Sequence, residues 1–179
     1  MPRFFAFLRA INIGGHTLKM DRLRQLFESL DFAHVETYIA SGNVIFEIDS
    51  LDTWSLENRI ESKLQEALGY AVPTFIRTPQ ELAAIAVYQP FPSAQFAAAA
   101  AYNVAFLKQP LDQPSQLKLQ ALRTELDDFR VHQRELYWLC RLRQSQSKFS
   151  NAVLEKTTAQ PSTLRGMNTI MKLVEQYPG

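Results

Sequence analysis

Cysteine and histidine are scarce in this chain, which has one cysteine and three histidines among 179 residues. A single cysteine, Cys140, cannot form an internal disulfide, and this favours a reducing compartment, so we expect a cytoplasmic protein. The three histidines lack the spacing of metal ligands. The sequence therefore predicts neither a metal site nor a cofactor.

The chain also lacks long hydrophobic runs and an excess of one charge. The apolar segment at residues 4–8 is flanked by Arg3 and Arg9, and it is too short for a membrane span or the core of a signal peptide. The 19 basic and 18 acidic residues leave a net charge of +1, which gives no general attraction to a phosphate backbone. We expect no membrane association, and nucleic-acid binding is not favoured.

The first half of the chain alternates between strand and helix patterns. Apolar runs and apolar spacings of two or of three and four predict, in order, a strand, a helix, a hairpin, a helix and a strand. The corresponding ranges are residues 3–11, 19–31, 35–48, 56–68 and 72–77. Because the hairpin supplies two strands, the order is that of the split βαβ, or ferredoxin-like, arrangement.

The second half repeats this order with little residue identity. Ala105-Phe106-Leu107-Lys108 corresponds to Ala6-Phe7-Leu8-Arg9, and patterns for a helix, a hairpin at 128–142 and a further helix follow. The last segment departs from the repeat. Its apolar residues have helical spacing where a strand is due, and they are Met167, Ile170, Met171 and Val174.

These patterns predict an α+β fold made of two ferredoxin-like halves packed together, the second ending in an extra helix. The first half is expected at residues 1–87 and the second at residues 102–179. Two prolines and an alanine run mark residues 88–101 as a connector.

Several strings of residues carry a resemblance to a known family. They include residues 7–15, Thr37 to Val44, Arg77-Thr78, and Arg165 with Asn168-Thr169. At this spacing they resemble DUF1697, an uncharacterised bacterial family. The resemblance implies a fold and a set of marked positions but no activity. The chain departs from the family's usual pattern at Gly166 and Met167, where the family carries Asn and Trp, and at Ala40, where it carries Gln.

The loop from Asn12 to Lys19 is the first candidate site. It joins the end of a strand to the start of a helix, where free N–H groups and the helix dipole favour anions. Gly14 and Gly15 would allow close approach of a phosphate, and Lys19 adds a positive charge. The alternative is a tight structural turn, since the loop matches neither the dinucleotide fingerprint nor the P-loop.

Arg165 is the second candidate. It is expected in the first turn of the last helix, where its charge opposes the helix dipole, and this unfavourable placement suggests a bound anion. Asn168 lies one turn further on, and a solvated helix face is the alternative. Ser41 and Asn43 could line a pocket, although Ser41-Gly42-Asn43 also has the composition of a hairpin turn.

The preferred hypothesis is a binding module for a small anionic ligand, such as a phosphate or nucleotide, in a cleft near the Gly14-Gly15 loop. Its expected residues are Arg9, Asn12, Gly14, Gly15, Lys19, Ser41, Asn43, Arg165 and Asn168. No catalytic residue is predicted. The alternatives are single-stranded nucleic-acid binding, an enzyme with an unrecognised site, or a structural homodimer, and the chain is expected as a monomer or homodimer.

Overall fold

A computed structural model describes residues 1–11, 17–39, 42–50 and 52–179. The chain divides into two compact units. The first contains Met1–Leu82 together with Tyr177–Gly179, and the second contains Ala83–Gln176. In the described ranges, no helix combines the length and the apolar character needed to cross a membrane.

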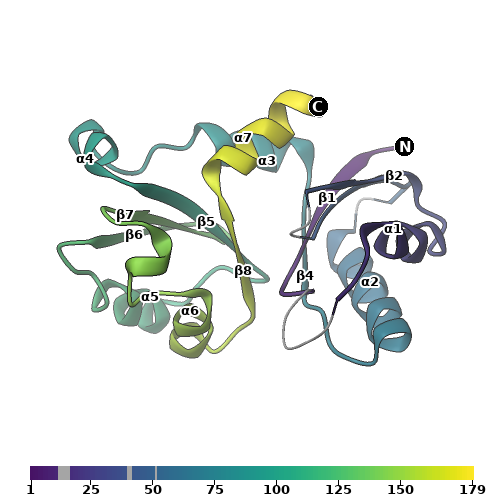
Figure 1. The fold of residues 1–179 in the computed structure, drawn as a ribbon, viewed down its shortest axis with the longest axis horizontal. Helices are drawn as coiled ribbons and strands as arrows, with labels where there is room; N and C mark the ends of the chain where they lie inside the picture. The colour runs from purple at the N-terminus through teal and green to yellow at the C-terminus, as the bar shows by residue number, and fades with distance from the viewer. Residues whose placement is uncertain (12–16, 40–41, 51) are drawn as a thin grey trace. The chain divides into compact units, whose positions relative to one another are not determined.

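The first unit is a four-stranded antiparallel sheet with two helices on one face (Figure 1). Its elements are β1 (Arg3–Leu8), α1 (Met20–Glu28), β2 (Ala33–Tyr38), β3 (Asn43–Glu47), α2 (Thr53–Leu68) and β4 (Thr74–Arg77). The strand order β2-β3-β1-β4 is the predicted ferredoxin-like order. The apolar, aromatic strand β1 is central, as its composition predicts.

Alternation along β1 builds the core of the first unit. Phe4, Ala6 and Leu8 belong to the same buried cluster as the apolar stripes of α1 and α2. Phe27 of α1 packs edge-on against Phe46 of β3, with ring centroids 5.7 Å apart. Helix α2 ends where expected, because Gly69 takes the left-handed conformation at φ 82°.

Residues 177–179 complete the first unit from the far end of the sequence. The Tyr177 hydroxyl donates a hydrogen bond of 2.6 Å to the Glu36 carboxylate of β2. Its ring lies edge-on to Phe5, and the Arg3 guanidinium stands 5.8 Å from the ring centroid. Arg3 also donates to the carbonyl oxygen of Pro178. This short segment is therefore fixed by several different contacts on one side of the sheet.

The second unit repeats the same topology, with strand order β6-β7-β5-β8. Helix α3 (Pro79–Val87) leads into it, and its elements are α4 (Ser93–Ala98), β5 (Ala101–Leu107), α5 (Gln113–Gln120), β6 (Asp127–His132), β7 (Glu135–Cys140), the short 3₁₀ helix η1 (Gln144–Gln146), α6 (Asn151–Thr158), β8 (Ser162–Gly166) and α7 (Met167–Gln176). The prediction of two ferredoxin-like halves is confirmed. The expected connector, residues 88–101, contains α4 and the first residue of β5.

Strand β8 corrects the sequence-based prediction for the last segment. Arg165 and Gly166 lie in this strand, so the prediction that Arg165 opposes a helix dipole is wrong. The helix begins at Met167, and its buried residues are Met167, Ile170 and Leu173, whereas Met171 is 53% exposed. Strand β8 is short and of mixed polarity, and therefore gives no clear alternation.

A second signal could have found β8. Pro161-Ser162-Thr163-Leu164-Arg165 matches Pro73-Thr74-Phe75-Ile76-Arg77 in pattern, and the latter contains β4. Both strands lie at the edge of their sheet, and a helix follows each of them directly. The repeat is therefore complete, and a final helix is common to both halves.

Glutamate side chains from a neighbouring helix accept hydrogen bonds from backbone N–H groups of the two equivalent edge strands, β4 and β8. In the first unit, the Glu57 and Glu61 carboxylates of α2 each accept a hydrogen bond of 2.8 Å, from the N–H groups of Ile76 and Thr74 respectively. In the second, Glu155 of α6 accepts from the N–H of Ser162 at 3.0 Å. Unpaired backbone groups at a sheet edge can form hydrogen bonds with a strand of another chain. The glutamate side chains already bond to these N–H groups, which disfavours such pairing.

We expect Glu57→Leu to lower the free energy of unfolding by about 2 kcal/mol, because it leaves the buried N–H of Ile76 without its acceptor. Glu57→Gln should cost less, since the amide oxygen still accepts. Chemical denaturation measures both changes. Glu66→Gln, an exposed position on the same helix, is the control. A Glu57→Leu variant as stable as this control would contradict the edge-capping role.

Candidate functional site

The predicted anion site falls partly outside the described residues. Asn12, Gly14, Gly15 and Ser41 are in the undescribed segments. Lys19 is the exposed N-cap residue of α1, and its side chain makes no capping hydrogen bond. Arg9 follows β1, where its backbone N–H donates to the carbonyl oxygen of Pro73 at 2.9 Å.

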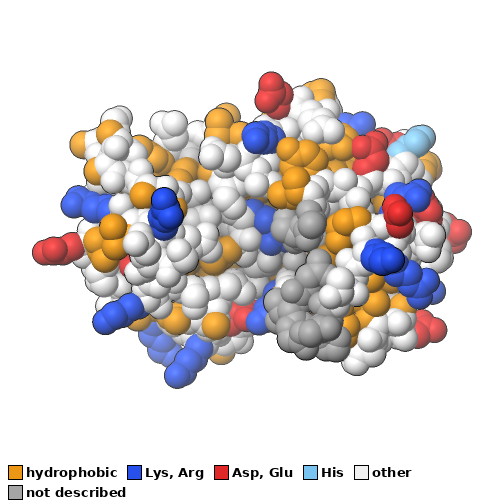
Figure 2. Space-filling model, viewed as in Figure 1, with side chains coloured by type: hydrophobic (Ala, Val, Ile, Leu, Met, Phe, Trp, Pro, Cys, Tyr) orange, Lys and Arg blue, Asp and Glu red, His pale blue; other side chains and the backbone are white. Residues whose placement is uncertain are grey.

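The surface of the first unit is of mixed charge. Acidic and basic side chains are interspersed over it on the face drawn in Figure 2. Two ion pairs of this unit join β3 to its neighbouring strands, since Glu47 contacts Arg3 of β1 at 3.4 Å and His34 of β2 at 2.8 Å. The hydrogen bond from His34, with a smaller contribution from Arg3, holds the pKa of Glu47 below its ordinary value. These pairs hold neighbouring strands together.

The Gly42-Asn43 part of the hairpin turn has a structural role. The buried Asn43 side chain donates to the carbonyl oxygen of Tyr38 at 2.9 Å, which closes the hairpin on itself. Gly42 has a φ of 82°, and its carbonyl oxygen accepts from the N–H of Leu8 at 2.8 Å. A Cβ at Gly42 would lie 3.1 Å from the Cβ of Leu8. Both contacts favour the structural alternative for this turn.

Arg165 is buried, with 8% of its surface exposed. Its guanidinium donates to the Thr163 hydroxyl at 2.7 Å and to the carbonyl oxygen of Leu164 at 2.8 Å. Burial lowers the pKa of Arg165 to about 10, so the group stays charged at neutral pH. Its repeat equivalent, Arg77, is fully buried and donates in the same way to the carbonyl oxygen of Ile76 at 2.8 Å. The pair is thus a shared feature of both halves.

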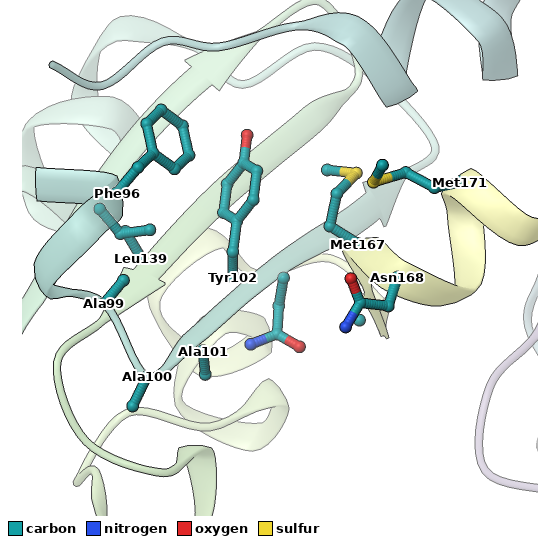
Figure 3. Close-up of a pocket in the computed structure, with 11 residues that line it drawn as sticks. Phe96, Ala99, Ala100, Ala101, Tyr102, Leu139, Met167, Asn168 and Met171 are labelled. Atoms are coloured by element: carbon teal, nitrogen blue, oxygen red, sulfur yellow. The ribbon is translucent and has the colours of Figure 1, made fainter. Parts of the chain in front are cut away.

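Asn168 lines a pocket of about 440 Å³ within the second unit (Figure 3). The walls come from the end of α4, the start of β5, the far end of β7 and the junction of β8 with α7. The lining residues are Phe96, Ala99, Ala100, Ala101, Tyr102, Asn103, Leu139, Gly166, Met167, Asn168 and Met171. Of the nine residues predicted for a site, only Asn168 is among the described lining residues, and Arg165 is its neighbour three positions earlier.

Sheet register places a side chain opposite a glycine at the pocket. Asn103 of β5 pairs directly with Gly166 of β8, so the two positions share one face of the sheet. A Cβ at Gly166 would lie 3.8 Å from Oδ1 of Asn103, which is an ordinary contact, and the glycine leaves that space open. The pocket wall is therefore built from a glycine and a flexible methionine at positions 166 and 167.

Asn103 is the unusual polar group of the pocket. The residue is only 5% exposed, and its Nδ2 atom is buried without a hydrogen-bond partner among the described residues. A buried donor left without an acceptor costs roughly 1–3 kcal/mol. Most buried polar groups in proteins are paired, so this exception needs an explanation. Sequence reasoning missed Asn103, because an asparagine in an apolar strand gives no motif.

The Tyr102 ring forms one wall of the pocket, and a hydrogen bond from its hydroxyl group holds it in place. Its hydroxyl donates to the carbonyl oxygen of Tyr88 at 3.2 Å. Burial, with a smaller contribution from Tyr88, raises the pKa of Tyr102, so the phenol is neutral at physiological pH. In Figure 3 the ring stands between Phe96 and the adjoining Met167 and Met171 side chains. The ring is thus a fixed, uncharged surface.

The pocket has the chemistry of a binding site. Its described lining contains no carboxylate, imidazole, thiol, lysine or arginine. Within the described ranges, no group of three or more His, Cys, Asp and Glu residues could hold a metal ion. The lining offers two carboxamides, two aromatic rings and apolar surface, which can hold a ligand by hydrogen bonds and packing.

We expect opposite effects from alanine at the two glycines. Gly42→Ala should lower the free energy of unfolding by about 2 kcal/mol, because the left-handed backbone disfavours a Cβ that also meets Leu8. Gly166→Ala should leave it unchanged or raise it by up to about 1 kcal/mol, since its backbone accepts an L-residue. Guanidinium denaturation of the two variants measures the difference. Equal stabilities would show that the Gly42 turn is not packed as described.

Comparisons with other proteins place the chain in a family and a fold. The structure of the conserved bacterial protein SP0830 from Streptococcus pneumoniae is similar, with a TM-score of 0.76 and 20% sequence identity over 98% of each chain. This likeness concerns the fold. No curated protein matches the chain. The sequence pattern of the family described as "Protein of unknown function (DUF1697)" matches residues 1–137. Because the match covers most of the sequence, the chain belongs to the DUF1697 family.

Proposed function

We propose that the protein binds a small neutral molecule in the pocket of its second unit. The observation that carries this proposal is the buried Asn103 carboxamide, whose Nδ2 has no partner among the described residues although the residue lines an open cavity. The cavity of about 440 Å³ lies within the 300–1,000 Å³ typical of small-molecule sites. Oδ1 of Asn103 lies beside the space left open at Gly166, so a ligand in the cavity could donate a hydrogen bond to this carboxamide.

The described lining residues include no charged side chain, which favours a neutral ligand. An ion placed against Tyr102, Leu139 and Met167 would lose hydration without gaining a counter-ion from the described lining. Arg165 is close in sequence, but it pairs with Val104, so its side chain projects from the sheet face opposite to that of Asn103 and Gly166. Its guanidinium donates to Thr163 and Leu164 instead.

Binding of a small anion at the start of α1 is the second candidate. Helix N-termini present free N–H groups, and Lys19 occupies the N-cap position without a capping hydrogen bond from its side chain. Gly14-Gly15 precedes it in sequence. The support comes from the sequence and from one helix end, so it is weaker than that for the pocket.

Nucleic-acid binding has less support. RNA-recognition modules of this topology stack bases on aromatic side chains of the sheet. In the second unit the corresponding rings are already in contact with others, since Tyr102 packs against Phe91 and Phe96, and Tyr137 against Tyr88. Tyr137 is 1% exposed. We further propose a cytoplasmic location, which agrees with a single cysteine that is buried and unpaired in a disulfide.

A thermal-shift screen with neutral, ring-containing fragments tests the pocket. We expect at least one fragment to raise the melting temperature of the native protein, because a ligand that binds only the folded state stabilises it. Gly166→Ile should abolish the shift by filling the space over Asn103. Leu117→Gln on α5, exposed and outside the pocket, is the control and should keep it. A shift that survives in Gly166→Ile, or no shift with any fragment, contradicts the proposal.

Titration with inorganic phosphate, followed by calorimetry, tests the second candidate. Lys19→Gln should weaken binding severalfold, and added salt should weaken it further, because the site is exposed. Lys63→Gln on α2 removes the same charge elsewhere in the first unit and serves as the control. Equal effects of the two variants, or no heat of binding at low salt, would argue against an anion site at α1.

A further inference from the structure

The pocket lies beside a stretch of β5 that has no strand partner on one side. Strand β8 ends at Gly166, opposite Asn103, and the chain then turns into α7. Ala101 and Tyr102 therefore extend β5 beyond the end of β8, and both line the pocket. In Figure 3, Ala101 and Met171 of α7 lie on opposite sides of the pocket. The cavity thus borders the path that β8 would follow if it continued as a strand.

The pairing pattern indicates that the Tyr102 N–H group points towards this path. In an antiparallel sheet the backbone groups of successive residues face alternate neighbours. Leu107 donates its N–H to the carbonyl oxygen of Arg134, beside β7, at 2.9 Å. Its β8 partner, Ser162, donates outward to Glu155 of α6, so these two residues do not bond to each other. Tyr102 lies an odd number of positions before Leu107, and its N–H therefore faces the side where β8 has ended.

The two faces of β5 give the pocket two different surfaces. Alternation places Asn103 and Gly166 on one face, and Tyr102 with its partner Leu139 on the other. The first face offers the Asn103 carboxamide oxygen beside the space that Gly166 leaves open. The second is apolar, and Phe96 packs edge-on against the Tyr102 ring with centroids 5.0 Å apart. A rigid ring cannot contact both faces, whereas an extended chain directs successive substituents to opposite sides.

We infer that the pocket binds a small, uncharged, extended amide of the N-acylated amino-acid amide class, which continues the path of β8 along β5. A carbonyl group of the ligand accepts from the Tyr102 N–H, as in a strand added to a sheet edge. An apolar substituent packs on the Tyr102 ring, and the next substituent donates to Oδ1 of Asn103. Because the described lining holds no charged side chain, the amide has no charged end. This inference rests on the proposed ligand-binding function of the pocket.

Calorimetric titration of the whole chain with matched peptides tests the inference. The reference probe is N-acetyl-leucyl-serinamide, which places its leucine opposite Tyr102 and its serine opposite Ala101, and we expect it to bind. Methylation of the leucine nitrogen should weaken binding about fivefold or more, because it removes an N–H and adds bulk on the edge that faces β5. Uncapped leucyl-serine has two charged ends and should also bind more weakly.

Amide NMR spectroscopy locates the contact on the protein. Binding of the reference probe should move the Tyr102 N–H resonance and slow its hydrogen exchange, because the group gains an acceptor. The Leu107 N–H, which is already bonded to Arg134, is the internal control and should change little. A probe that binds but leaves the Tyr102 N–H unaffected contradicts the addition of a strand.

A cycle of variants tests the contact with Asn103. Replacing the serine of the probe with alanine should weaken its binding to the unmodified chain severalfold. The two probes should bind equally to Asn103→Leu, which lacks the acceptor. Gly166→Ala narrows the same space and should also reduce the difference, and it is expected to fold normally, so the test survives a folding failure of Asn103→Leu. A serine preference that persists in both variants contradicts this contact.

The outcomes separate this inference from the proposed function. If neutral fragments bind and Gly166→Ile abolishes their binding, but the amide probe binds no more tightly than its N-methylated form, the inference is wrong and the proposed function stands. If no neutral fragment and no amide probe binds, both are wrong.

Discussion

The fold depends on how β4 and β8, one edge strand of each sheet, satisfy the backbone groups that no neighbouring strand reaches. In each half a helix supplies the acceptor, with Glu57 and Glu61 at β4 and Glu155 at β8. Asn151 adds a second link by donating to the carbonyl oxygen of Ser162 and accepting from its hydroxyl. These contacts tie each edge strand to the helix layer as well as to the sheet, so they fix its position from two directions.

The pocket is a consequence of that positioning. Once β8 is held along β5, its register sets Gly166 opposite Asn103, and the strand passes at once into α7. The missing side chain at Gly166 and the start of the helix at Met167 then leave space over a carboxamide that is otherwise enclosed. An unpaired buried donor lowers stability, so a native protein that keeps one calls for an explanation in function or in an ordered water. Asn103 and Gly166, which are paired on the neighbouring strands β5 and β8, therefore link the fold to the proposed binding function.

Much of the fold could be predicted from the sequence, whereas little of the pocket could. Strand β1 and helices α1 and α2 have strong apolar patterns, and Thr78 and Glu81 form a capping box at the start of α3, a pairing that is readable from sequence. Strand β8 gave no such pattern, because an edge strand held by helix side chains does not need alternating apolar residues. Asn103 was missed for a related reason: its significance comes from the residue opposite it, Gly166, which is 63 positions away in sequence and adjacent only through strand pairing. Of the residues predicted for an anion site, Asn168 lines the pocket and Asn43 closes a turn.

The placement of residues 177–179 in the first unit has a consequence for how the protein is made. The second unit is inserted, in chain order, between Leu82 and Tyr177, and the ring and hydroxyl of Tyr177 pack on Phe5 and Glu36. On the ribosome, the first sheet therefore emerges early but waits for its last contacts until the whole second unit has been synthesised. Until Tyr177 has been synthesised, Phe5 and Glu36 lack the ring and the hydroxyl that pack on them in the folded chain.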